Sequence, residues 1–127
     1  MANITFKDGL IYADATLTHG NKKVTIKSAL VDTGSAATVI SNEIANELGL
    51  KPELTDIINS VQGIGGYETV IEKIIDSVSL DTTAVTSFNI QVGAMDYGIE
   101  LEAIIGLDML TSCKAVLDLN NFTLKTA

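Results

Sequence analysis

Residues 29–35 of this chain place a carboxylate directly after an apolar run. The run Ala29-Leu30-Val31 is followed at once by the polar sequence Asp32-Thr33-Gly34-Ser35. A carboxylate at the end of a buried strand costs on the order of several kcal/mol unless hydrogen-bond donors satisfy it. The hydroxyl and backbone N–H groups of the next three residues can supply those donors. The segment therefore predicts a buried strand that ends in a tight polar loop around Asp32.

The composition fits one globular domain, residues 1–127, because 46% of the residues are hydrophobic and only 19% are charged. With 16 acidic and 8 basic residues, the net charge of -8 repels nucleic acid and anionic membranes. One histidine, His19, and one cysteine, Cys113, are too few for a zinc site within one chain. The lone cysteine is compatible with a reducing compartment. We therefore expect a cytoplasmic protein without a metal, nucleic-acid or membrane partner.

The apolar pattern predicts a mostly β protein with one or two short helices. A meander of strands covers residues 4–31, and a helix begins at Ser41 or Asn42 and stops at Gly49. A glycine cluster at residues 63–66 predicts the tip of a hairpin, because the segments beside it are β-branched. A terminal hairpin is expected to place Asn120 and Asn121 at positive φ in its turn. Further strands are expected at residues 78–80, 88–92 and 101–105, and helical turns at residues 107–111.

The order of these segments resembles the retropepsin-like aspartic proteases of the single-domain, non-viral type. The resemblance is carried by Asp32-Thr33-Gly34-Ser35 after an apolar strand, by the glycine hairpin, and by Ile104-Ile105-Gly106 downstream. It spans nearly the whole chain. It implies a closed, orthogonal β-barrel of the acid-protease type with one lobe per chain, and an aspartic endopeptidase that needs no cofactor.

Peptide hydrolysis by carboxylates needs two of them facing one water molecule, and this chain supplies one. One carboxylate takes a proton from the water while the other, protonated, polarises the scissile carbonyl. A second copy of the motif is absent, because Asp81-Thr82-Thr83 lacks the glycine and Asp96-Tyr97-Gly98 has a bulky ring in place of a small hydroxyl. The sequence thus predicts a homodimer that brings two copies of Asp32 together across a two-fold axis.

The resemblance also implies roles for the neighbouring residues. Gly34 directs its N–H at the Asp32 carboxylate, Thr33 reaches the backbone of the other chain, and Ser35 bonds the outer carboxylate oxygen. Ile104 and Ile105 line the cleft for an extended peptide or protein substrate, and Gly106 gives backbone room. The hairpin residues correspond to the flap that closes over the substrate in such enzymes; they are Gly63, Ile64, Gly65 and Gly66.

The chain departs from the retroviral members at two positions. An acidic residue and an arginine that pair in those enzymes are replaced here by Ala36 and Leu107. Because both replacements are apolar, we expect a hydrophobic contact in place of the ion pair. The difference leaves the chemistry intact but changes the dimer, for which the terminal hairpin is the expected interface.

The same residues allow other interpretations. An isolated Asp-Thr-Gly is a common turn, and the glycine cluster could belong to a nucleotide-binding loop, but Glu68 stands where the dinucleotide pattern needs another glycine. Asp108 is expected in the first turn of a short helix rather than as a second catalytic acid. The alternative to an active peptidase is a catalytically silent peptide-binding or dimerisation module with the same fold.

Overall fold

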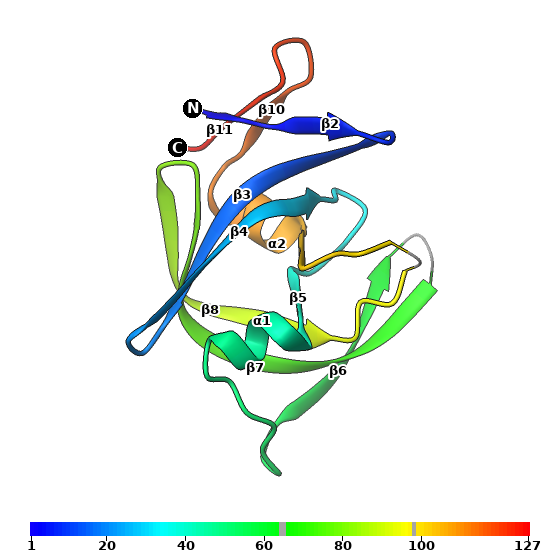
Figure 1. Ribbon diagram of the computed structural model, residues 1–127, viewed down its shortest axis with the longest axis vertical. Coiled ribbons are helices and arrows are strands. Elements are labelled where there is room, and N and C mark those ends of the chain that lie inside the picture. The colour runs from blue at the N-terminus through cyan, green and yellow to red at the C-terminus, as the bar shows by residue number, and fades with distance from the viewer. Residues whose placement is uncertain (64–65, 98) are drawn as a thin grey trace.

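The computed structural model describes residues 1–63, 66–97 and 99–127, and most of them lie in β-strands (Figure 1). The two helices are short: α1 (Asn42–Glu47) and α2 (Leu107–Ser112). The strands are β1 (Ala2–Asn3), β2 (Thr5–Lys7), β3 (Leu10–His19), β4 (Lys22–Val31), β5 (Val39–Ser41), β6 (Ile57–Gly63), β7 (Gly66–Leu80), β8 (Thr83–Gly93), β9 (Ala103–Ile105), β10 (Val116–Asp118) and β11 (Thr123–Lys125). The predicted mostly β class with short helices is confirmed.

The main sheet has eight strands in the order β2-β3-β4-β9-β5-β8-β7-β6. An additional pairing of β3 with β7, centred on Leu17 and Val78, joins the strands into a ring. Only three residue pairs make this closure, while β2 and β6 remain as edge strands. The structure therefore confirms a ring of paired strands. It does not confirm the closed, orthogonal barrel that was predicted.

Strand β7 is longer than the sequence pattern predicts. Its 15 residues combine the second arm of the expected hairpin with the separate strand expected near Val78. The alternation of buried residues shifts along the strand, since Val70 is buried, then Ile75, and then Val78 and Leu80. A strand that changes its buried face breaks the period of two on which such predictions depend.

Both helices begin and end close to the predicted residues. Ser41 is the N-cap of α1, and its hydroxyl accepts a hydrogen bond from the backbone N–H of Ile44 at 3.2 Å. Gly49 follows with a φ of 78°, the left-handed conformation that commonly ends a helix. In α2, Met109 and Leu110 are the buried residues that attach the helix to the core.

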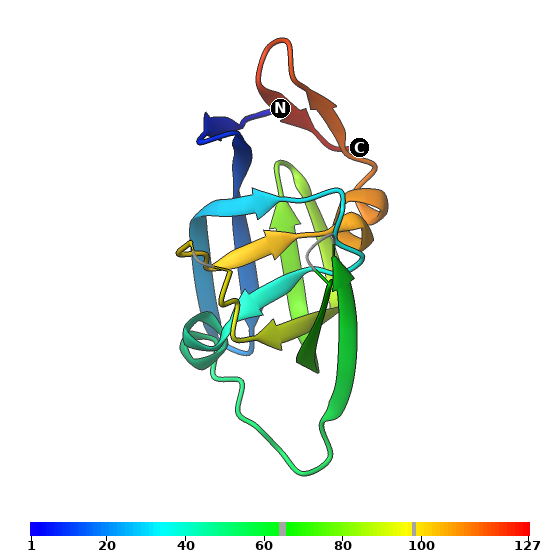
Figure 2. The same cartoon turned by 90° about the vertical axis from the view of Figure 1, so that its right-hand side faces the viewer.

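The two ends of the chain form a separate three-stranded sheet in the order β1-β11-β10 (Figures 1 and 2). The predicted terminal hairpin is thus confirmed, but its positive φ lies at Phe122, with a value of 52°, and not at the asparagines. Asp118 explains the difference, because its Oδ1 accepts hydrogen bonds from the backbone N–H groups of Asn120 and Asn121 at 2.9 and 3.0 Å. The turn is therefore held by a side chain that the prediction left out.

The buried residues divide into two clusters. The larger fills the ring of strands and includes Leu17, Ile26, Ile75 and Ile90. The smaller, which we call the floor cluster, consists of Leu30, Val39, Val70, Met95, Leu101 and Ile104. In the part of the chain that the structure describes, neither helix is long and apolar enough to cross a membrane.

Candidate active site

Three adjacent strands position the Asp32 loop. Strand β9 lies between β4 and β5, parallel to the first and antiparallel to the second (Figure 2). Val31 pairs with Ile105 at the end of β4, and the backbone N–H of Asp32 donates to the carbonyl of Ile105 at 3.0 Å. The downstream Ile-Ile-Gly segment therefore supports the loop that carries Asp32.

The loop holds the Asp32 carboxylate by backbone contacts. The N–H of Gly34 donates to Asp32 Oδ1 at 2.8 Å, and the N–H of Ser35 donates to the Asp32 carbonyl at 3.1 Å. Thr33 and Gly34 are exposed, so they can meet another surface. Ser35 differs from expectation, because its hydroxyl donates to the Ala37 carbonyl at 2.8 Å and not to the Asp32 carboxylate.

Asp32 lines a cavity of about 250 Å³ between the floor cluster and the hairpin of β6 and β7. Its apolar lining comes from both sides of the cavity; it includes Leu30, Val39, Val61, Ile99, Leu101 and Ile104. The sequence-based expectation put Ile105 in the cleft beside Ile104, but Ile105 is 1% exposed and lies in the larger core cluster. Successive residues of a strand point to opposite faces, so only one of the two isoleucines can reach the cavity.

The described part of the predicted glycine hairpin lines this cavity, through residues that include Val61 and Gly66. Gly63 pairs with Gly66 at the end of β6 and β7, while the predicted flap residues Ile64 and Gly65 lie outside the described residues. Gly66 has a φ of 116°, which only glycine adopts readily, and it lines the cavity together with Tyr67. The Tyr67 side chain is 74% exposed, which leaves surface that a ligand in the cavity can bury.

Gly106 allows the segment after β9 to pass close to the Asp32 loop. A Cβ atom at this position would lie 2.5 Å from the carbonyl carbon of Ala37 and 2.9 Å from the carbonyl oxygen of Ser35. Backbone atoms cannot move aside as a flexible side chain can. Any larger residue at position 106 would therefore displace the loop that carries Asp32.

A polar contact that the sequence did not predict joins the same two segments. The carboxylate of Asp108 accepts from the Thr38 N–H at 3.0 Å and from the Thr38 hydroxyl at 2.7 Å. The Thr38 hydroxyl also accepts from the N–H of Gly106 at 3.1 Å. Asp108 does lie in the first turn of α2, as expected. The available signal was Thr38 itself, since a hydroxyl within a buried apolar run needs a partner.

The expected hydrophobic contact between Ala36 and Leu107 stays a prediction, because both residues are exposed in the single chain, Leu107 by 42%. The N–H of Leu107 donates to the Ser35 carbonyl at 2.9 Å. This backbone contact and the pair of Thr38 with Asp108 connect the two segments within one chain.

A second carboxylate, Glu68 of β7, also lines the cavity. Both of its oxygens have donors: Oε1 accepts from the Met95 N–H at 3.2 Å, and Oε2 accepts from the Tyr97 hydroxyl. Glu68 is therefore engaged with the loop after β8 and does not form a pair with Asp32. No periodic pattern in the sequence pointed to this contact, because residues 94–97 belong to no regular element.

The clearly shifted pKa values belong to groups outside the cavity. Burial raises the pKa of the Cys113 thiol, which disfavours the reactive thiolate. Hydrogen bonds to the carboxylates lower the pKa values of Asp56, Asp81 and Asp118. Among the described residues, no three His, Cys, Asp or Glu side chains gather as metal ligands.

Comparison with known proteins gives the family. Residues 15–109 match the model of a family described as aspartyl protease. No curated protein sequence matches the chain. The structure is similar to that of a retropepsin-like aspartic protease from Rickettsia conorii, with a TM-score of 0.66 and 20% sequence identity, over 93% of this chain and 83% of that one. With the family model matching most of its length, the chain belongs to the aspartyl protease family and has a retropepsin-like fold.

Proposed function

We propose that the protein is a homodimeric aspartic endopeptidase in which each chain, a single domain of residues 1–127, contributes one Asp32. The observation that carries this proposal is the position of Asp32. Its carboxylate is held by the Gly34 N–H at the edge of an apolar cavity, on a loop whose next two residues are exposed. A second copy of the loop can therefore approach the first.

In the proposed reaction the two carboxyl groups share one proton, so that one is ionised while the other is protonated. The ionised group takes a proton from water, and the water oxygen attacks the scissile carbonyl carbon. The protonated group donates its proton to the carbonyl oxygen. Collapse of the tetrahedral intermediate breaks the C–N bond, with a proton passing to the leaving nitrogen. The Gly34 N–H fixes the direction of the Asp32 carboxylate by its hydrogen bond to Oδ1.

The proposed substrate is an extended peptide segment with apolar side chains beside the scissile bond. Support comes from the apolar lining of the cavity and from the hairpin above it, which would act as a flap. An extended peptide between the hairpin and the floor cluster can bond the backbone of both chains while its side chains enter the cavities. Gly66, at the start of β7, has no neighbouring atom within 4 Å of where a Cβ would lie, which leaves room for that backbone.

The proposed dimer interface continues from the Asp32 loop to the terminal sheet. A depression of about 340 Å³ beside Thr33 is lined by residues of α2 and β10, including Leu110 and Leu117. Leu107 also lines this depression and is 42% exposed. The terminal hairpin beside it carries further exposed apolar side chains; they are Val116, Leu119 and Phe122. A surface of this kind is typical of a protein contact, and its continuity with Thr33 favours a second copy of the chain.

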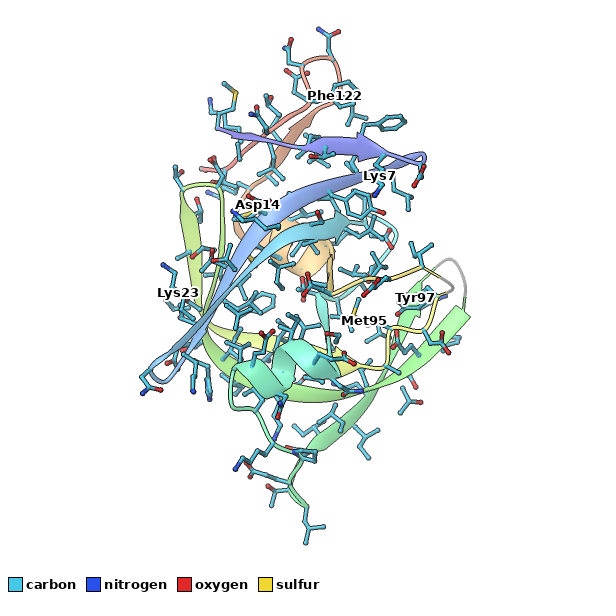
Figure 3. All side chains as sticks on the ribbon, in the orientation of Figure 1. Lys7, Asp14, Lys23, Met95, Tyr97 and Phe122 are labelled. Atoms are coloured by element: carbon cyan, nitrogen blue, oxygen red, sulfur yellow. The ribbon has the colours of Figure 1, made fainter. Side chains whose placement is uncertain are left out.

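The central test replaces Asp32 with asparagine, which keeps the size of the side chain but cannot act as a base. We expect Asp32→Asn to remain a folded dimer and to lose at least about a thousandfold in kcat against a mixed peptide library. Asp14→Asn, the same change at an exposed position on β3 (Figure 3), is the control and should keep full activity. Wild-type turnover by the Asp32 variant would end the proposal.

The stoichiometry of inhibitor binding separates an active dimer from a silent binding module. A statine-type peptide mimics the tetrahedral intermediate and binds tightly only to a competent carboxylate pair. We expect one inhibitor to bind per two chains. Equal binding of extended peptides by the wild type and by Asp32→Asn, with cleavage by neither protein, would instead identify the silent module.

A further inference from the structure

Glu68 connects the hairpin above the cavity to the loop that forms its wall. It lies on β7, two residues beyond Gly66, and its side chain reaches residues 95–97 after β8. The N–H of Met95 donates to Oε1 at 3.2 Å, and the hydroxyl of Tyr97 donates to Oε2. Figure 3 shows Met95 and Tyr97 on the loop that runs beside the ends of β6 and β7. One carboxylate thus holds two donors from a segment without regular structure.

Gly93 makes room for this carboxylate. A Cβ atom at position 93 would lie 2.5 Å from Glu68 Oε1 and 3.1 Å from Val70 Cγ1. Gly93 has no positive φ, so its backbone conformation does not require glycine. Glycine is needed at position 93 because any side chain there would collide with the Glu68 carboxylate.

The contact also fixes the conformation of Met95. This residue has a φ of 55°, in the left-handed region that side chains other than those of glycine, asparagine and aspartate rarely adopt. Its side chain is 4% exposed and belongs to the floor cluster, of which Leu30, Val39, Leu101 and Ile104 line the cavity. By accepting the Met95 N–H, Glu68 holds the backbone that directs this side chain into the floor.

We propose that Glu68 is a positioning residue that sets the width of the cavity beside Asp32 and thereby its preference for substrate side chains. Glu68 belongs to the hairpin, Tyr97 to the wall and Met95 to the floor, and the carboxylate joins all three. The inference rests on the proposed peptidase function. Without Glu68 the wall and the hairpin separate, and the cavity accepts large and small apolar side chains with less discrimination.

The test compares Glu68→Ala and Glu68→Gln on two peptides that differ only in a large or a small apolar residue beside the scissile bond. We expect Glu68→Ala to raise KM about tenfold for the preferred peptide and to leave kcat within about threefold, because hydrogen bonds to a charged group are lost but Asp32 is untouched. Glu68→Gln should stay within about threefold in both constants, since its amide oxygen can accept from Met95 and its amide nitrogen can donate to Tyr97.

Glu72 on the same strand is the matched control. Its carboxylate accepts from Asn59 at 3.0 Å and from Gln91 at 3.4 Å, but it does not line the cavity. Glu72→Ala should lower the thermal stability and leave KM and the preference between the two peptides unchanged. Equal effects of Glu68→Ala and Glu72→Ala on KM would show that any loss of a buried contact in β7 has the same result, and would overturn the proposal.

A double-mutant cycle isolates the contact itself. Gly93→Ala should reproduce the rise in KM caused by Glu68→Ala, because the new methyl group displaces the carboxylate. Combined with Glu68→Ala, it should add less than about twofold, since the displaced group is already gone. If the rise in KM of the double variant equals the product of the two single-variant increases, the two residues act independently and the proposal is wrong.

Amide hydrogen exchange of Met95 tests the contact without any activity. We expect exchange at the Met95 N–H to rise at least about tenfold in Glu68→Ala and to stay near the wild-type rate in Glu68→Gln and Glu72→Ala. If the protein cleaves no peptide but this pattern holds, the proposed function fails while the positioning contact stands. Unchanged Met95 exchange in Glu68→Ala would overturn the contact whatever the activity.

Discussion

Thr38 is the residue on which the Asp32 loop and α2 both depend. It is 1% exposed, and its hydroxyl donates to Asp108 and accepts from Gly106. We expect Thr38→Val, which keeps the shape, to lower the free energy of unfolding by about 2 kcal/mol, because the buried Gly106 N–H and the half-buried Asp108 carboxylate each lose a partner. Urea unfolding followed by circular dichroism measures the change.

The control for this substitution is Thr111→Val. The Thr111 hydroxyl donates to the Leu107 carbonyl at 2.7 Å, but the residue is exposed on α2. Its replacement should change the free energy of unfolding by less than about 0.5 kcal/mol. Equal destabilisation by both variants would contradict the role assigned to Thr38.

At the scale of elements, the segment between α1 and β6 is attached to β7 by Lys73, which forms ion pairs with Asp56 and Glu53. Lys73 Nζ donates to Asp56 Oδ1 at 2.5 Å, and the Glu53 N–H donates to Asp56 Oδ2 at 2.7 Å. These bonds, that of Lys73 first, hold the pKa of Asp56 below its usual 3.8. A carboxyl with a lowered pKa stabilises the folded state above its unfolded pKa, and this contribution is lost as the pH falls through the folded value.

Asp56→Asn should therefore be less stable than the wild type at pH 6, and the difference should shrink as the pH falls below 3.8. The difference between the urea midpoints of Asp56→Asn and the wild type, measured at intervals from pH 6 to pH 2, tests this expectation. Glu53→Gln is the comparison, because the Glu53 side chain is 66% exposed and 3.8 Å from Lys73. It should leave the pH dependence unchanged, and a constant gap between Asp56→Asn and wild type across the range would refute the assignment.

The elements show which features a sequence predicts and which it leaves out. The helix at Ser41 and the hairpin around the glycine cluster were predictable, because caps and glycines act on their own neighbours. The unbroken length of β7 and the position of Ile105 were not, because they depend on which face of a strand meets the core. Contacts such as Thr38 with Asp108 join residues 70 positions apart, and no local pattern encodes them.

At the scale of the whole molecule, the proposed active centre exists only where two chains meet. Below the dissociation constant of the dimer, a tenfold dilution should reduce the activity per chain by about tenfold, since the amount of dimer falls with the square of the concentration. Leu119→Glu should raise the concentration at which activity per chain is lost by at least about tenfold. Leu119 is 59% exposed in one chain, and the substitution places a charge on the apolar surface of the proposed interface.

Sedimentation velocity over the same concentrations reports the dimer directly. Ile74→Glu is the matched control, since Ile74 is 61% exposed on β7, a strand of the eight-stranded sheet and not of the terminal sheet. It should leave both the sedimentation and the activity curves in place. Identical curves for Leu119→Glu and the wild type would place the interface elsewhere on the surface.

The division of the apolar interior into two clusters has a consequence for how such an enzyme can diversify. The six side chains of the floor cluster are separate from the larger set that fills the ring of strands. Four of the six, Leu30, Val39, Leu101 and Ile104, line the cavity, so substitutions among these four change its shape and leave the packing of the larger cluster in place. Selection, or a protein engineer, can thus change the substrate preference of the proposed peptidase at one cluster of residues while the residues of the other cluster stay the same.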